Sequence, residues 1–416
     1  MSSLAPMSSL APVRRPEDEL LLCCSRTRRS PETADRITAL LREGINWEHL
    51  LQAANAHGVA PLLYWHLDAV CPEAIPSDVY DQLRNHFRAN GLRNLHLTGE
   101  LLKLLNTFAT HGILAVPYKG AALAAAVYGN LALREFGDLD ILVHRHDVPK
   151  ARELMVSTGY QPRYQLTCAQ EASFLRSQRE YAFTHNDGTI IVELHWGITE
   201  RYFFPLDTER LWERLHRIPL GGDTVLSLSP EDLLLTLCVH GCRHAWERLG
   251  WVCDVAELVR VHRDMRWEQV MSQASALGGE RMLFLGLFLA SDLLGVVLPE
   301  KMSQKIQVDP TVKALAERTR EQLFQETARP IALLKGYEGA PAFHSLEGAP
   351  AFHSLHLEVR ERLVDKIRYC FHKAITPKEE DWDLLSLPKF LFPFYYVLRP
   401  IRLTGKYGPR ILKRLL

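Results

Sequence analysis

The spacing of hydrophobic residues changes twice along the chain. Apolar side chains recur at helical spacing over residues 17–110, and again from residue 226 to about residue 373. Between these stretches, over residues 111–225, short apolar runs typical of strands alternate with short helical segments. The pattern predicts an α+β protein in which a small mixed sheet is flanked by N-terminal and C-terminal α-helical regions.

Two end segments complete this division of the chain. Residues 1–16 are expected to be disordered, and residues 374–416 form a basic, aromatic tail. Within the tail, residues 388–416 contain seven lysines and arginines and no acid, while prolines and glycines disfavour one long amphipathic helix. Docking of the tail onto the rest of the protein is the favoured interpretation, and the alternatives are weak contact with a membrane surface and binding of an acidic partner.

The central segment is predicted to form an ordered series of short elements. Asp147 is expected to cap a helix, and the turn Asn186-Asp187-Gly188 between β-prone residues is a strong hairpin signal. In chain order the expected elements are a strand, a helix, a second strand, a second helix and a hairpin, at 113–118, 121–128, 138–143, 148–158 and 180–196.

Three carboxylates fall on the strands of this segment. Asp138 and Asp140 are spaced i and i+2, so both project from one face of their strand. Glu193 lies on the second hairpin strand, and the three acids converge if the two strands are neighbours. Acids held this close repel each other unless a cation or a proton lies between them, and Mg²⁺ is typically held by carboxylates and substrate phosphates. The sequence therefore predicts a Mg²⁺ site at Asp138, Asp140 and Glu193.

Positively charged residues precede the acidic strand. Lys119 and Gly120 stand where a helix begins, so a cation and backbone N–H groups are available to phosphate oxygens. Arg134, four residues before Asp138, is expected to neutralise charge on a leaving pyrophosphate. The alternatives are that Lys119 is an ordinary exposed lysine and that Arg134 pairs with Glu135 or another nearby acid.

The order of these motifs resembles the DNA polymerase β-type nucleotidyltransferase superfamily. More narrowly, it resembles the bacterial uncharacterised nucleotidyltransferase family, whose pattern is a Lys-Gly turn, an arginine before an acid-x-acid strand, a helix ending in Gly-Tyr and an acid-x-His-Trp strand. The corresponding residues here are Lys119-Gly120, Arg134, Asp138 and Asp140, Gly159-Tyr160 and Glu193-Leu194-His195-Trp196. The resemblance extends over roughly residues 45–260.

The resemblance implies transfer of a nucleoside monophosphate from an NTP, with ATP the expected donor, to an acceptor with Mg²⁺ as cofactor. Asp138 and Asp140 would be metal ligands, and Glu193 would be a third ligand or a general base. Lys119, Gly120 and Arg134 would contact the nucleotide. One position departs from the superfamily, because Ala121 replaces the usual Gly or Ser and removes a hydroxyl contact to phosphate.

Several histidines and cysteines invite other assignments. By alternation His195 lies on the same side of its strand as Glu193, as a residue supporting the site or as a packed polar residue. His240, Cys242, His244 and Cys253 suggest a zinc site, but their spacing does not place the side chains on one helix face, so ordinary helix positions are favoured. Asp254 is expected to act as an N-terminal or pairing acid.

Composition limits the remaining possibilities. The formal net charge is zero, so no specific nucleic-acid partner is expected. The eight cysteines follow no disulfide framework and the N-terminus lacks a secretory h-region, which favours the cytoplasm. The acceptor is expected to be a small molecule, a peptide or a protein. Two alternative functions remain, a catalytically silent nucleotide- or partner-binding protein and a membrane-peripheral accessory protein.

Overall fold

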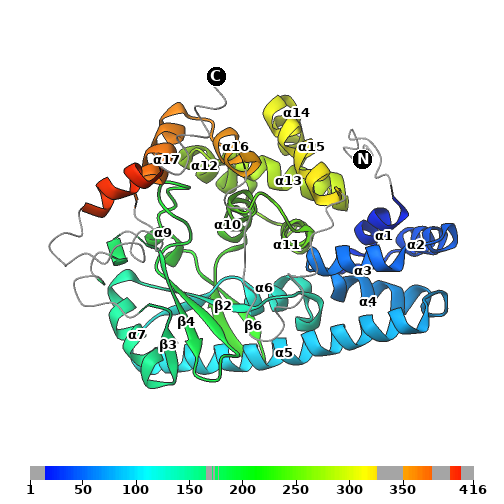
Figure 1. Ribbon diagram of the computed structural model, residues 1–416, viewed down its shortest axis with the longest axis horizontal. Helices are drawn as coiled ribbons and strands as arrows, with labels where there is room; N and C mark the ends of the chain where they lie inside the picture. Colours follow the sequence, from blue (N-terminus) through cyan, green and yellow to red (C-terminus); the bar gives the residue numbers. More distant parts are fainter. Residues whose placement is uncertain are drawn as a thin grey trace.

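The computed structural model describes residues 15–164, 171, 174–176, 178–325, 350–376 and 394–403. The expected disorder of residues 1–16 lies almost entirely outside them. Figure 1 shows a sheet on one side of a larger helical body, an α+β arrangement that confirms the predicted fold class. The N-terminal helices are α1 (Pro16–Cys24), α2 (Pro31–Glu43), α3 (Trp47–Ala56), α4 (Ala60–Val70) and α5 (Ser77–Thr110).

The central segment contains all the strands of the described chain. Its strands are β1 (Ala115–Pro117), β2 (Asp138–Val143), β3 (Tyr160–Pro162), β4 (Glu180–His185), β5 (Ile191–His195), β6 (His216–Leu220) and β7 (Asp223–Ser227). Its helical elements are α6 (Gly120–Leu123), the π-turn η2 (Ala124–Tyr128), the 3₁₀ turn η3 (Leu131–Leu133), α7 (Val148–Ser157) and α9 (Glu209–Trp212).

Helices return after β7. They are α10 (Pro230–Arg243), α11 (Leu249–Val261), α12 (Trp267–Leu277), α13 (Glu280–Leu294), α14 (Glu300–Val308), α15 (Pro310–Phe324), α16 (Pro350–Glu358) and α17 (Leu363–Ile375). Residues 395–403 are also helical, and the rest of the tail lies outside the described residues. No helix among the described residues is both long enough and apolar enough to span a bilayer. Contact of the tail with a membrane surface stays a prediction.

The main sheet is mixed, with strand order β1-β2-β5-β4-β3. Strands β2 and β5 are parallel neighbours, and every other pair in this sheet is antiparallel. Parallel neighbours need a crossover connection, here supplied by α7 and the β3–β4 segment. The pairing of β2 with β5 is the condition under which the sequence predicts convergence of the acids, and the structure meets it.

Two local predictions need correction. The expected helix over 121–128 consists of the short helix α6 followed by the π-turn η2, which ends at Gly129 in the left-handed conformation. Asp147 does stand at the N-terminus of α7, but its side chain makes no capping hydrogen bond. A single 3₁₀ turn directly before α7 holds Asp147 in helical backbone geometry, unlike the extended geometry of an N-cap.

The long helix α5 connects the helical body to the sheet. It has 34 residues and is therefore about 50 Å long, and it runs along the lower edge of Figure 1 from the N-terminal helices to the sheet. Val79 and Leu83 near its start pack in the core of the helical body, whereas Leu101 and Phe108 near its end pack in the core under the sheet. Side chains of the N-terminal and C-terminal helical regions share the first of these cores.

Two buried asparagines in the middle of α5 hold the segment that leads into β2. The side-chain amide of Asn90 donates to the carbonyl of Ala132 at 2.9 Å, and that of Asn94 donates to the carbonyls of Leu131 and Arg134 at 2.7 and 2.8 Å. Buried carbonyls of an irregular segment need such donors, because water cannot reach them. The helix thereby fixes the position of Arg134 and the start of the acidic strand β2.

Helices α10 and α13 approach each other closely around Trp246. This side chain is fully buried, and a Cβ added at Gly241 would lie 2.5 Å from its ring. We predict that Gly241→Ala lowers the free energy of unfolding by about 1–3 kcal/mol, because a closely packed core does not accept an extra methyl group without displacement. Urea unfolding followed by circular dichroism measures the change.

The control for this variant is Gly99→Ala on α5. A Cβ at Gly99 meets nothing within 4 Å, so alanine there should leave stability unchanged or raise it by roughly 0.5–1 kcal/mol through its better helix propensity. Equal unfolding midpoints for the two variants would contradict the close packing at Gly241.

Candidate active site

The register of β2 and β5 brings two of the predicted acids side by side. Asp140 is paired with Glu193 in the parallel ladder, and Asp138, two residues earlier, pairs with Ile191. Asp140 is 4% exposed, whereas Glu193 and Asp138 are partly buried. The ligand atoms of Asp140, Glu193 and His195 lie within 4.8 Å of one another, and Asp138 flanks this compact group on the same face.

His195 lies between the two carboxylates. Its Nε2 is 3.0 Å from Asp140 Oδ1 and 3.4 Å from Glu193 Oε2. On its other side, Nδ1 is 3.2 Å from Glu180 Oε2 on β4. Burial alone would lower the pKa of His195, but the hydrogen bonds to Asp140 and Glu193 outweigh it and raise the pKa to about 9. In this arrangement His195 is a charged donor that fixes both carboxylates.

Lys119 brings a second positive charge to Asp140. Its Nζ lies 2.9 Å from Asp140 Oδ1, and the side chain is 16% exposed. Burial disfavours its charged form, but the charges of Asp140, Asp138 and Glu193 outweigh burial and raise the pKa of Lys119. Lys119 is therefore not an ordinary exposed lysine.

The pKa values of Asp140 and Asp138 shift in opposite directions. Burial would raise the pKa of Asp140, but Lys119 and His195 outweigh it and hold the pKa well below its usual range. The pKa of Asp138 is raised to about 7, first by burial and then by the charges of Asp140 and Glu193. Lys119 and Arg134 lower the pKa of Asp138, but burial and the neighbouring acids outweigh them.

Gly120 allows the turn before α6 to approach β2. Its φ is +51°, in the left-handed region, and a Cβ would lie 3.3 Å from the carbonyl oxygen of Asp138 and 3.6 Å from the Phe136 ring. Only glycine enters this conformation without strain. The turn places Lys119 beside Asp140, so Gly120 contributes the backbone conformation and Lys119 contributes the charge.

Arg134 forms a buried ion pair. Its Nε and Nη2 donate to Asp254 on α11 at 2.7 and 2.9 Å, and the Tyr128 hydroxyl donates to the same carboxylate at 2.7 Å. Asp254 is thus a pairing acid, one of the two roles expected for it. The bidentate pair takes up the charge of Arg134 and joins the segment before β2 to the helical body.

A comparison with protein families agrees with this geometry. A family model described as uncharacterised nucleotidyltransferase matches residues 43–295, which is more than half of the chain and includes every site residue described above. The chain belongs to the uncharacterised nucleotidyltransferase family. Membership confirms the predicted family and enzyme class, and it implies an NTP substrate. A comparison with curated proteins finds no match.

A charged network of the nucleotidyltransferase extends beyond the predicted residues. Arg179 lies 2.7 Å from Glu180 and 3.5 Å from Glu200, and Glu200 also pairs with Arg243 of α10 at 3.1 Å. Sequence reasoning did not identify these residues. Glu180 could have been predicted, because the hairpin turn at residues 186–188 sets a register that places it opposite His195.

The zinc alternative finds no support in the described part of the chain. His240 and His244 pack against Trp251, with ring centroids 5.3 and 5.2 Å from it, while Cys242 and Cys253 are buried elsewhere in the helical core. The only potential metal-binding group among the described residues is the cluster of Asp140, Glu193 and His195. Burial and the charge of Lys119 lower the pKa of His240, so this imidazole is neutral beside the nucleotidyltransferase site.

The Arg134–Asp254 pair gives a stability prediction. Asp254→Ala removes the partner of a buried guanidinium and should cost about 3–5 kcal/mol of the free energy of unfolding. Urea denaturation measures the cost. The matched control, Glu19→Ala, breaks the exposed Arg36–Glu19 pair and should leave the unfolding midpoint nearly unchanged. Similar midpoints for both variants would show that the buried pair does not hold β2 to the helical body.

Proposed function

We propose that the protein transfers a nucleoside monophosphate from an NTP, with ATP the expected donor, to an acceptor hydroxyl. A bond forms between the acceptor oxygen and the α-phosphorus, the bond from that phosphorus to the β-phosphate bridging oxygen breaks, and pyrophosphate leaves. The proton of the hydroxyl passes to a base or to water. The observation that carries this proposal is the direct pairing of Asp140 with Glu193 on parallel strands, with Asp138 on the same face and Lys119 against Asp140.

The donor set suits a divalent cation with a preference for oxygen. Asp138, Asp140 and Glu193 offer carboxylate oxygens, which Mg²⁺ prefers, and they lie on a rigid pair of strands. The raised pKa of Asp138 supports a need for further positive charge. When bound there, Mg²⁺ would neutralise phosphate charge and lower the pKa of the attacking hydroxyl.

The residues of the chain take distinct roles in this proposal. Asp138, Asp140 and Glu193 are the metal ligands, and Glu193, as the most accessible acid next to His195, also suits proton removal. His195 orients Asp140 and Glu193 through its hydrogen bonds. Lys119 and the backbone at Gly120 would contact phosphate oxygens of the NTP.

Arg134 receives a different role from the one expected of it. Because its guanidinium forms a bidentate pair with Asp254, we assign Arg134 to positioning the segment before β2 in place of neutralising pyrophosphate. The order of turn, acidic strand and third acid supports a place in the DNA polymerase β-type superfamily. The acceptor would lie between the sheet and the flanking helices.

Replacing the acids tests the reaction. In Asp138→Asn/Asp140→Asn, transfer of label from an α-³²P NTP to an acceptor in cell extract should fall at least about 10³-fold, because two ligands of the cation are lost. Each of the four NTPs is incubated with Mg²⁺ or with EDTA, and pyrophosphate release is followed in parallel. EDTA should abolish the signal of the wild type.

The control is Glu153→Gln, which removes one exposed carboxylate from α7 and should retain wild-type activity. Transfer that persists in the double variant would refute the assigned ligands. NTP binding that is independent of Mg²⁺ and of both aspartates, with no turnover, would favour a silent nucleotide-binding protein.

Lys119 gives a second prediction. Without divalent cations, Lys119→Met leaves Asp140 with one positive partner fewer and should lower the free energy of unfolding by about 3 kcal/mol. Added Mg²⁺ should raise the melting temperature of the variant more than that of the wild type, since the cation replaces the missing charge. Differential scanning fluorimetry with and without Mg²⁺ measures both effects. A loss of stability that Mg²⁺ leaves unchanged would contradict a cation site at Asp140.

A further inference from the structure

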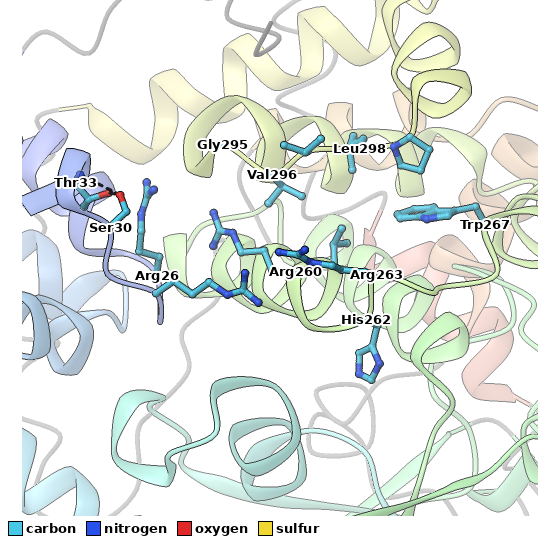
Figure 2. A pocket seen from close by; sticks show the side chains of 14 residues that line it. Arg26, Ser30, Thr33, Arg260, His262, Arg263, Trp267, Gly295, Val296 and Leu298 are labelled. Atoms are coloured by element: carbon cyan, nitrogen blue, oxygen red, sulfur yellow. Dashed lines mark hydrogen bonds between the residues drawn. The ribbon is translucent and has the colours of Figure 1, made fainter. Parts of the chain in front are cut away.

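A second charged site lies in the helical body, on elements that do not carry the acidic cluster. It is a cavity of about 640 Å³ between the connection of α1 to α2, the end of α11, the start of α12 and the loop between α13 and α14. Figure 2 shows Arg26, Arg260 and Arg263 in this cavity, with Ser30 and Thr33 at one end and Trp267 at the other. We call it the arginine cavity.

The lining of the arginine cavity is strongly biased in charge. It includes four arginines and a histidine and no acidic residue: Arg26, Arg28, Arg260, Arg263 and His262. Like charges gathered in this way repel one another, and the protein as a whole has no net charge that would produce such a bias by chance. The bias therefore points to a negatively charged occupant.

Little within the described part of the chain neutralises these arginines. Arg260 pairs with the buried Glu257, which also accepts a hydrogen bond from Thr27. Among the described residues, no carboxylate forms an ion pair with Arg26, Arg28 or Arg263. Burial and the charge of Arg260 lower the pKa of Arg26, and its Nε is buried without a hydrogen-bond partner. At least one buried donor thus has an unmet need for an acceptor.

We propose that the arginine cavity binds a small molecule that carries a phosphate group. The planar guanidinium forks match phosphate oxygens, and several arginines together can surround one phosphate. Ser30 and Thr33 add hydroxyl groups near Arg26 (Figure 2). The volume falls in the range of small-molecule pockets, so the ligand is larger than a single anion.

The far wall indicates what the rest of the ligand is like. Trp267 and Leu298 line the end of the cavity opposite Ser30 and Thr33, and Val296 lies between the two ends (Figure 2), so an apolar or aromatic body would pack against Trp267 while the phosphate meets the arginines. Arg28 and Arg263 are exposed, so such a ligand can enter from solvent. A phosphate monoester of nucleotide size fits both the charge and the walls.

The arginine cavity and the acidic site share one helix. Asp254, which pairs with Arg134, and Arg260, which lines the cavity, both lie on α11. The cavity is otherwise lined by residues that the proposed reaction does not use. The proposal of a phosphate site therefore holds or fails independently of the proposed transferase reaction.

Calorimetric titration tests the cavity directly. The full chain is titrated with AMP, pyrophosphate and inorganic phosphate, in EDTA and at about 0.15 M ionic strength, so that weak surface attraction is screened and metal-dependent binding is absent. We expect one equivalent of AMP or pyrophosphate to bind. Arg28→Gln/Arg263→Gln should weaken that binding at least about tenfold, because each charged hydrogen bond to phosphate contributes about 1.5–3 kcal/mol.

The matched control is Arg88→Gln/Arg217→Gln, which removes the same charge from exposed arginines on α5 and β6. It should change the affinity less than about twofold. Binding should also persist in Asp138→Asn/Asp140→Asn, while its loss in Arg28→Gln/Arg263→Gln assigns it to the arginine cavity. Melting temperatures equal to the wild type verify that the variants are folded. If none of the three probes binds, or if both arginine pairs weaken binding equally, the proposal is wrong.

Discussion

The buried carboxylate of Asp140 is the constraint on which the site depends. A charged acid that is 4% exposed must be balanced by nearby positive groups, since burial alone would drive it to bind a proton. Lys119 comes from the turn before α6 and His195 from the end of β5, so two separate elements meet at one side chain. The pairing of β2 with β5 and the left-handed turn at Gly120 are both needed for that meeting.

Side chains of the helical body fix the segment that leads into β2. Asn90 and Asn94 of α5 satisfy the carbonyls of the segment before β2, and Asp254 of α11 receives Arg134 from the same segment. The irregular segment is therefore fixed on two sides by buried hydrogen bonds. Because α5 also packs in both hydrophobic cores, a change in the helical body can reach the acidic strand through packed side chains and not through a flexible linker.

Acidic and basic side chains gather at two separate places in a chain whose formal net charge is zero. The acids gather on one face of the sheet with fewer positive partners than negative groups, and the arginines gather in a cavity of the helical body with fewer acids than they need. Each imbalance costs free energy in the ligand-free protein, and each is relieved by an ion of opposite sign. Helix α11 has side chains at both places, with Asp254 toward the sheet and Arg260 toward the cavity.

Local sequence patterns predict the class of fold and the acids of the candidate site. Apolar residues alternate along the strands and recur every three to four residues along the helices. These spacings and the turn at residues 186–188 are local properties, so the elements and the shared face of Asp138 and Asp140 could be predicted. The tertiary structure decided what depends on contacts between distant segments. The pairing of Arg134 with Asp254, the position of His195 between two acids and the gathering of four arginines join residues up to more than 200 positions apart. No local period encodes such contacts, because they arise only when packed helices and paired strands bring those side chains together.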